Sequence, residues 1–242
     1  MRLFRIFIFI AACLSGVSVS GQETDKTATA PTGSSKGGAW GYFGLRGGAH
    51  FSEVLFSDTF RPVNMQTSFV YGKQYGAVGK LFLAEHAGIQ VEVNYIEKGY
   101  KQLLDSGFYT TKMNYLEIPL LMNAYLGKQK TQFFVNMGPY LEIFLNQKDE
   151  LQGVVKEGEE FYRFDPNVDR TIGYGLRASG GLNRLFTFGL LQLEGGLEVT
   201  ISDMIFSNRL LSTIPDSSKH LVGFVSLAYM IPIGKKPDTG GQ

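Results

Sequence analysis

Nine ionisable side chains lie at alternate positions in strand-like stretches, each on the more polar face of its stretch. They are Arg46, His50, Lys80, Glu92, Glu117, Glu142, Arg177, Glu194 and Glu198. Cations and carboxylates that share one interior can pair with one another, or can line a path for protons or ions. Both an ion-pair network and a conducting path require residues that are far apart in the sequence to face each other. Whether they do so depends on the secondary-structure elements that carry them.

The stretch from Met113 to Gly127, MNYLEIPLLMNAYLG, shows most clearly which element this is. Taken two residues at a time it separates into an apolar file and a mixed file, which is typical of a strand with one apolar face. A helix fits poorly, because Pro119 would remove a hydrogen bond in mid-segment. The apolar file is Leu116, Ile118, Leu120, Met122, Ala124 and Leu126, and the mixed file is Tyr115, Glu117, Pro119, Leu121, Asn123 and Tyr125.

Such an apolar face meets either a second sheet in a soluble sandwich or lipid in a membrane barrel. The same alternation predicts eight strands, at 40–52, 75–83, 88–98, 113–127, 131–145, 170–182, 188–202 and 220–233. Their connections alternate in length, with longer ones at 54–74, 99–111, 146–169 and 203–219 and short ones at 84–87, 127–130 and 183–187. This favours the barrel, because outer-membrane barrels combine short periplasmic turns with longer outer loops.

The predicted fold class is therefore an all-β, eight-stranded antiparallel up-and-down transmembrane β-barrel over residues 40–234. Strands of roughly nine to fifteen residues are long for soluble sheets but suit a tilted bilayer crossing. Aromatic residues near the strand ends are compatible with the belts found at membrane interfaces. These are Trp40, Tyr42, Tyr75, Tyr95, Tyr125 and Tyr229.

Composition excludes several classes of function. The 242 residues carry a formal net charge of only +1, which gives no indication of nucleic-acid binding. The single cysteine, Cys13, lies in the predicted signal, so the mature chain would have no disulfide, thiolate metal site or cysteine nucleophile.

Residues 1–21 are predicted to be a cleaved secretory signal, with Arg2 and Arg5 before an apolar stretch and small residues after it. A retained membrane anchor and a lipoprotein signal ending at Cys13 are the alternatives. Residues 22–39 form a flexible polar leader, and 235–242 a polar tail. Export followed by insertion of the barrel predicts a location in the outer membrane.

The interior of an eight-stranded barrel is only wide enough to be filled by side chains. The nine ionisable residues are therefore expected to form a polar network that plugs the lumen. A small channel that conducts protons or solutes is the alternative. A rim hydrolase or acyltransferase built from Asp203, Ser218 and His220 is a third hypothesis, without a supporting motif. No cofactor is indicated, and His50, His86 and His220 lack the spacing of metal ligands.

The long outer loops are where recognition would be expected. Loop 146–169 is acidic in its middle and aromatic after it, which would suit a partner protein or a surface polysaccharide. A solvated loop without a partner fits the same composition.

The chain resembles the PorT-like family of small outer-membrane β-barrel domains, which is related in architecture to OmpA/OmpX-type barrels of Gram-negative bacteria. The resemblance covers about 40–234 and is carried by YLEIPLLMNAYLG at 115–127, GIQVEVNYIEKGY at 88–100, GYFGLRGGAHFSE at 41–53 and FFVNMGPYLEIFL at 133–145. It implies a barrel in contact with outer-membrane lipid, no defined enzymatic activity, and an accessory role beside envelope or secretion-apparatus proteins. The polar tail after Ile233 departs from the aromatic residue that ends many such barrels.

Overall fold

The computed structural model describes residues 41–56, 66–84, 86–104, 107–127, 130–153, 163–167, 169–204 and 218–234. The predicted signal (1–21), leader (22–39) and tail (235–242) lie outside these ranges and stay predictions. Residues 154–162 and 168 of loop 146–169 and residues 205–217 of loop 203–219 also lie outside them. Within the described ranges, no helix has the length and apolar character needed to cross a membrane.

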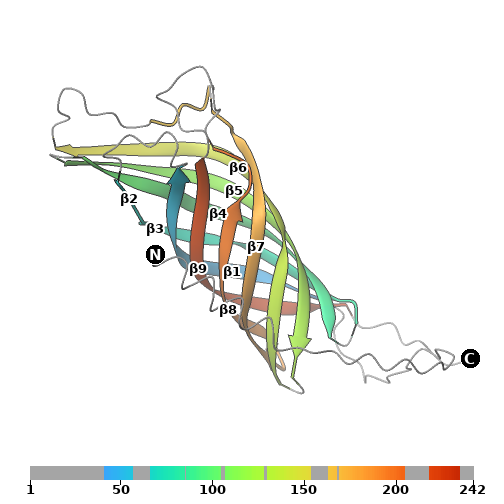
Figure 1. The fold of residues 1–242 in the computed structure, drawn as a ribbon. Coiled ribbons are helices and arrows are strands. Elements are labelled where there is room, and N and C mark those ends of the chain that lie inside the picture. The colour runs from blue at the N-terminus through green and yellow to red at the C-terminus, as the bar shows by residue number, and fades with distance from the viewer. Residues whose placement is uncertain are drawn as a thin grey trace, which may run out of the picture. The chain divides into compact units, whose positions relative to one another are not determined.

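Nine strands are described, and eight of them close into a ring (Figure 1). The strands are β1 Gly41–Phe56, β2 Gln66–Ser68, β3 Val70–Phe82, β4 Ala87–Leu104, β5 Gly107–Leu126, β6 Thr131–Gly153, β7 Ile172–Phe186, β8 Gly189–Thr200 and β9 Ser218–Ile233. From β3 onward each strand pairs antiparallel with the next, while β1 pairs with both β3 and β9. The three-residue β2 adds only a short pairing to β4. The predicted antiparallel up-and-down barrel of eight strands is confirmed.

Alternation of side chains separates an apolar outer wall from a polar lumen. On β5, Met122 is 77% exposed while Glu117 is fully buried. Leu45 on β1 and Val225 on β9 are likewise exposed, whereas Arg46 and His50 on β1 and His220 on β9 are buried. A wall of exposed leucine, valine and phenylalanine is unfavourable in water but matches the hydrocarbon core of a bilayer.

Glycines on the lumen side allow the first and last strands to close the ring. A Cβ atom at Gly44 would overlap the carbonyl oxygen of Tyr229, and one at Gly48 would overlap that of Val225. Both positions lie on the seam between β1 and β9. Closure leaves no strand edge unpaired along this seam, as a hydrocarbon environment requires.

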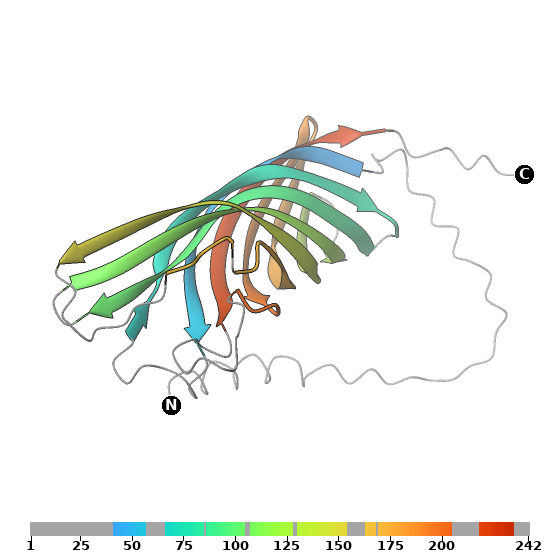
Figure 2. The ribbon, with the colours of Figure 1, turned by 90° about the horizontal axis from the view of Figure 1, so that it is seen from above.

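The predicted loop at 99–111 is wrong, because β4 continues to Leu104 and β5 begins at Gly107. Strand β6 likewise runs to Gly153 and not to 145, so β4, β5 and β6 extend past the ends of their neighbours (Figure 2). Polar residues occupy both faces of this extension, which hid the period of two. Beyond the hydrocarbon core an outward residue no longer has to be apolar. The alternation of apolar and polar residues therefore weakens, although the hydrogen bonds between the strands continue.

Two of the aromatic residues expected at the membrane interface point elsewhere. Tyr125 is buried in the lumen and Tyr42 packs against a buried cluster there, whereas Tyr75 and Tyr229 are exposed on the outer wall. Position along a strand could not distinguish these groups. The face is fixed by parity, and Tyr42 and Tyr125 share the parity of the inward residues.

Candidate functional site

All nine ionisable residues predicted to face the lumen are buried, and none exceeds 4% exposure. They come from β1, β3, β4, β5, β6, β7 and β8, and each has the inward parity of its strand. The structure brings seven of them into direct ion pairs, together with Lys98, which sequence reasoning missed. We call these eight residues the lumen network: Arg46, Glu92, Lys98, Glu117, Glu142, Arg177, Glu194 and Glu198.

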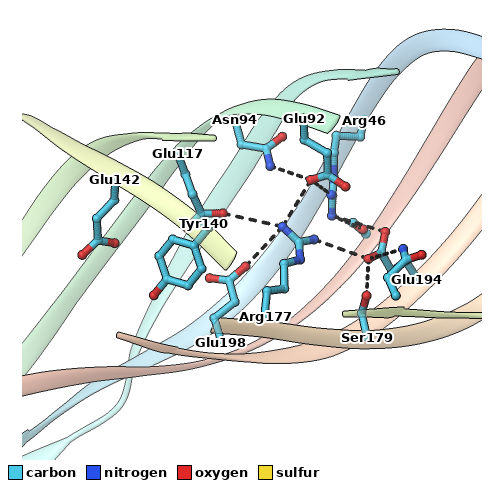
Figure 3. Close-up of polar contacts among 12 residues, drawn as sticks. Arg46, Glu92, Asn94, Glu117, Tyr140, Glu142, Arg177, Ser179, Glu194 and Glu198 are labelled. Atoms are coloured by element: carbon cyan, nitrogen blue, oxygen red, sulfur yellow. Dashed lines mark hydrogen bonds and ion pairs between the residues drawn. The ribbon is translucent and has the colours of Figure 1, made fainter. Parts of the chain in front are cut away.

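Arg177 on β7 lies among four carboxylates from three other strands (Figure 3). Its guanidinium nitrogens are 3.2 Å from Glu92, 3.6 Å from Glu117, 3.5 Å from Glu194 and 3.3 Å from Glu198. The guanidinium carbon also lies 4.1 Å from the centre of the Phe224 ring. A planar cation with five donors is suited to such a position, because it can engage several acceptors at once.

Arg46 joins the network from the opposite side of the ring. It pairs with Glu92, lies 3.8 Å from Glu194, and donates a hydrogen bond to the Ser226 hydroxyl at 2.6 Å. Glu92 also accepts from the amide of Asn94 at 2.8 Å. These polar contacts offset part of the cost of taking the carboxylate out of water.

Lys98 forms the second centre of the network, toward the end of the barrel that carries the long connections. Its ammonium is 2.8 Å from Glu117, 2.9 Å from Glu142 and 3.6 Å from Glu198. It lies 4.8 Å from the ring centre of Tyr140, whose hydroxyl is hydrogen-bonded to Thr200 at 2.9 Å. The sequence carried a usable signal for Lys98, because this residue ends the predicted strand 88–98 and has the same inward parity as Glu92.

Two of the predicted residues stand apart from these ion pairs. Lys80 donates to the Gln192 amide at 2.5 Å, and Gln192 donates in turn to Glu194 at 2.9 Å, so a single amide links this lysine to the network. His50 is hydrogen-bonded to the backbone carbonyl of Glu97 at 2.5 Å.

Apolar clusters occupy the lumen on both sides of the lumen network. Toward the short turns the cluster is Val78, Leu190, Ala228 and Met230, with Tyr42, Phe82 and Leu185 packed against it. Toward the long connections it is Val54, Ile96, Tyr100, Tyr109, Met113, Tyr115, Phe164 and Met204, with Phe144 packed against it. The charged layer is therefore enclosed along the barrel axis by side chains that offer water little favourable interaction.

Phe164 reaches the outer cluster from the segment that precedes β7. It is 1% exposed, its ring centre lies 5.0 Å from that of Phe144, and its carbonyl accepts from the Gln147 amide at 3.0 Å. Arg163 beside it pairs with Asp149 at 3.1 Å. Burial, and then the nearby Asp149 carboxylate, raise the pKa of the Tyr109 phenol above its ordinary value. Phe164 therefore adds an aromatic side chain to the apolar cluster at the end of the lumen with the long connections.

Four cations face five carboxylates in the lumen when Lys80 is included with the lumen network. Every lumen-network member has an oppositely charged neighbour within 4 Å, so the arrangement can fix the positions of six strands, β1 and β4 to β8, relative to one another. Among the described residues, no group of three or more His, Asp or Glu side chains is arranged to hold a metal.

The residues considered for a rim enzyme have other contacts. Asp203 accepts a hydrogen bond from the backbone N–H of Ser218 at 3.0 Å. His220 is buried, with its ring centre 6.1 Å from that of Tyr115. His86 lies exposed at the turn before β4.

The sequence matches the family described as outer membrane protein beta-barrel domain over residues 38–205. Among solved structures, OprG from Pseudomonas aeruginosa is 12% identical, covers 81% of this chain and 98% of its own, and gives a TM-score of 0.43. Neisserial surface protein A is 10% identical, covers 79% of this chain and 97% of its own, and gives a TM-score of 0.40.

Ail, the attachment invasion locus protein of Yersinia pestis, was solved in complex with the heparin analogue sucrose octasulfate. It is 8% identical, covers 79% of this chain and 99% of its own, and gives a TM-score of 0.39. No curated protein matches the sequence. Because the family match spans well over half of its length, the chain belongs to the outer membrane protein beta-barrel domain family.

Proposed function

We propose that this outer-membrane barrel is a structural or interaction protein of the PorT-like type, with a lumen plugged by its own side chains. Its rigid wall holds the long outer loops in place, and those loops recognise a partner in the envelope. The partner class that the resemblance implies is a component of a protein secretion apparatus.

The observation that carries this proposal is the order of layers inside the barrel. A buried ion-pair layer centred on Arg177 and Lys98 lies between two apolar clusters, and Phe164 packs into the outer one. An ion entering the lumen would have to displace charges already held by neighbours within 4 Å and cross apolar side chains on either side. This arrangement opposes the passage of ions, whereas the ion pairs between strands make the barrel wall more rigid, as a scaffold requires.

Conductance measurements test the plug. The purified full chain, inserted singly into planar lipid bilayers, is expected to give no stable openings at moderate voltage. Alanine at Phe164, which removes the ring from the outer cluster, should also leave the barrel closed because the lumen network remains. Clear and reproducible openings of the unmodified protein would contradict the proposal and favour a small channel.

Affinity purification from detergent-solubilised envelope tests the partner. Secretion components are expected to co-purify with the full chain. Replacing residues 154–162 with a glycine and serine linker of equal length should remove them, because this segment contains the acidic and aromatic part of the predicted loop. The same replacement at 57–65 is the matched control. Recovery of the same proteins with both variants would refute recognition by residues 154–162, and absence of secretion components from the intact protein would refute the accessory role.

A further inference from the structure

The outer wall formed by β1, β3 and β4 carries a group of aromatic side chains near the end with the long connections. Tyr75 stacks on Tyr95 with ring centres 5.0 Å apart, and Phe51 meets Tyr71 edge-on at 5.7 Å. Tyr71, Tyr75 and Phe51 are more than half exposed. Rings with a polar tip or edge on a lipid-facing wall are typical of the interface between acyl chains and headgroups.

Lysines follow on the same outward face, at and just beyond these rings. Lys73 lies between Tyr71 and Tyr75 on β3, while Lys101 on β4 and Lys112 on β5 lie farther along the extension. Their parity is outward, because the intervening Gln74, Gln102 and Thr111 are buried in the interior. Lys148 on β6 stands directly opposite Lys112 in the register. We call Lys73, Lys101, Lys112 and Lys148 the lysine stripe.

One feature of the lysine stripe is unfavourable in the protein alone. Like charges directly opposite each other on neighbouring strands, as Lys112 and Lys148 are, destabilise a sheet. Glu97 offsets only part of this charge, through a contact with Lys112 at 3.0 Å. An anionic ligand on this face would relieve the repulsion.

The lysine stripe groups four like charges on neighbouring strands from β3 to β6. On the other strands the described charges at this end are single and of both signs, with Glu53 on β1, Lys219 on β9 and the exposed Arg170 just before β7. A solvated rim accounts for single charges of this kind, but the lysine stripe concentrates four cations on adjoining strands. The lysine stripe adjoins the lipid-facing wall at Lys73, between Tyr71 and Tyr75, so an anionic ligand can reach it from the membrane.

We propose that the lysine stripe binds the phosphate groups of lipid headgroups in the outer leaflet. Lysine stems can lie along the apolar wall while their ammonium groups reach the headgroup level, where the aromatic rings place the interface. Glu97 limits this binding by holding Lys112. The ligand is therefore a phosphorylated lipid, and the attraction is electrostatic. Each lysine near the membrane surface is expected to raise the affinity for this lipid roughly fivefold.

Titration of the detergent-solubilised full chain with lipid A, followed by native mass spectrometry, tests the proposal. The variant Lys73→Gln/Lys101→Gln/Lys112→Gln should retain lipid A about tenfold less well or worse, and added salt should narrow this difference. The matched control, Lys130→Gln/Arg184→Gln/Lys219→Gln, removes the same charge elsewhere and should retain it normally. Glu97→Gln should increase retention, because it releases Lys112.

Two further arms identify the source of the signal. Lipid A without its phosphates should bind equally weakly to the unmodified protein and to the lysine variant, and inorganic phosphate should not compete at millimolar concentration. Equal loss of lipid A in both triple variants would overturn the proposal. The proposal would also be overturned if an acidic polysaccharide bound the unmodified protein more tightly than the lysine variant while lipid A bound both equally. Matching far-UV circular dichroism of all variants ensures that the comparison is made between folded barrels.

Discussion

Replacing Arg177 by methionine is expected to destabilise the barrel strongly while leaving its outer surface unchanged. Methionine approximates the length of the arginine stem and creates little empty volume, so the main change is the loss of one buried cation. Four carboxylates then lose a neighbour that lies 3.2 to 3.6 Å away. The excess of carboxylates over cations in the lumen grows from one to two.

Removing one partner of a buried ion pair typically costs about 3–5 kcal/mol, because the remaining charge is left uncompensated. Arg177 has four such partners, of which Lys98 can still hold Glu117 and Glu198, and Arg46 can hold Glu92 and Glu194. We therefore expect a loss of about 3–5 kcal/mol and not a multiple of it. Adding Glu198→Gln should recover part of that loss by restoring the original charge balance.

The free energy of unfolding is measured by urea titration of the full chain folded into phospholipid vesicles, followed by far-UV circular dichroism. Arg184→Met is the matched control, since Arg184 is exposed at the end of β7 and should lose no more than about 0.5 kcal/mol. A loss below about 1 kcal/mol for Arg177→Met, the value of an exposed ion pair, would refute the reasoning. An additional loss from Glu198→Gln in the same background would refute the account by charge balance.

Three further substitutions test the wall, the seam and the closure of the lumen. Leu227→Arg places a charge on the lipid-facing side in mid-barrel and should cost about 2–4 kcal/mol in the vesicle assay, whereas Leu83→Arg beside the short turn should cost about 0–1 kcal/mol. Gly44→Ala should lower the yield of folded barrel because its Cβ would overlap the β9 backbone, while Gly47→Ala, whose Cβ would have no heavy atom nearer than 4.0 Å, should fold normally. Phe164→Ala should make the segment before β7 more sensitive to protease, and unchanged cleavage there would contradict its packing in the lumen.

The proposed plug changes where function can be sought in this protein. Seven of the nine charged residues that stand out in the sequence form ion pairs with one another or with Lys98, so they stabilise the scaffold. Functional contacts are then expected on the outside, at the lipid-facing wall and the long connections. This is consistent with the lysine stripe, which lies on the outer face of β3 to β6.

Sequence alone determined which residues face lipid and which face the lumen, because the side chains of a strand alternate by a local rule. Leu120 and Glu117 could be assigned to opposite faces without knowledge of any neighbouring strand. The closed barrel was also predicted, from strand length and from the alternation of short and long connections, although one of the four longer connections, 99–111, proved to be mostly strand. Along Lys101 to Thr111 the outward residues no longer face hydrocarbon and need not be apolar, so the alternation weakened and the sequence did not predict these parts of β4 and β5.

Only the tertiary structure decided which inward residues meet. Arg177 and Glu92 are 85 positions apart in the sequence, and their contact depends on closure between β1 and β9 and on the stagger of every strand between them. Lys98 is a centre of the lumen network because register and ring closure bring its ammonium within 3.6 Å of three carboxylates from β5, β6 and β8. The alternation along a strand determines which face each residue occupies. Strand register and ring closure determine its position along the barrel axis and the residue on another strand that it contacts.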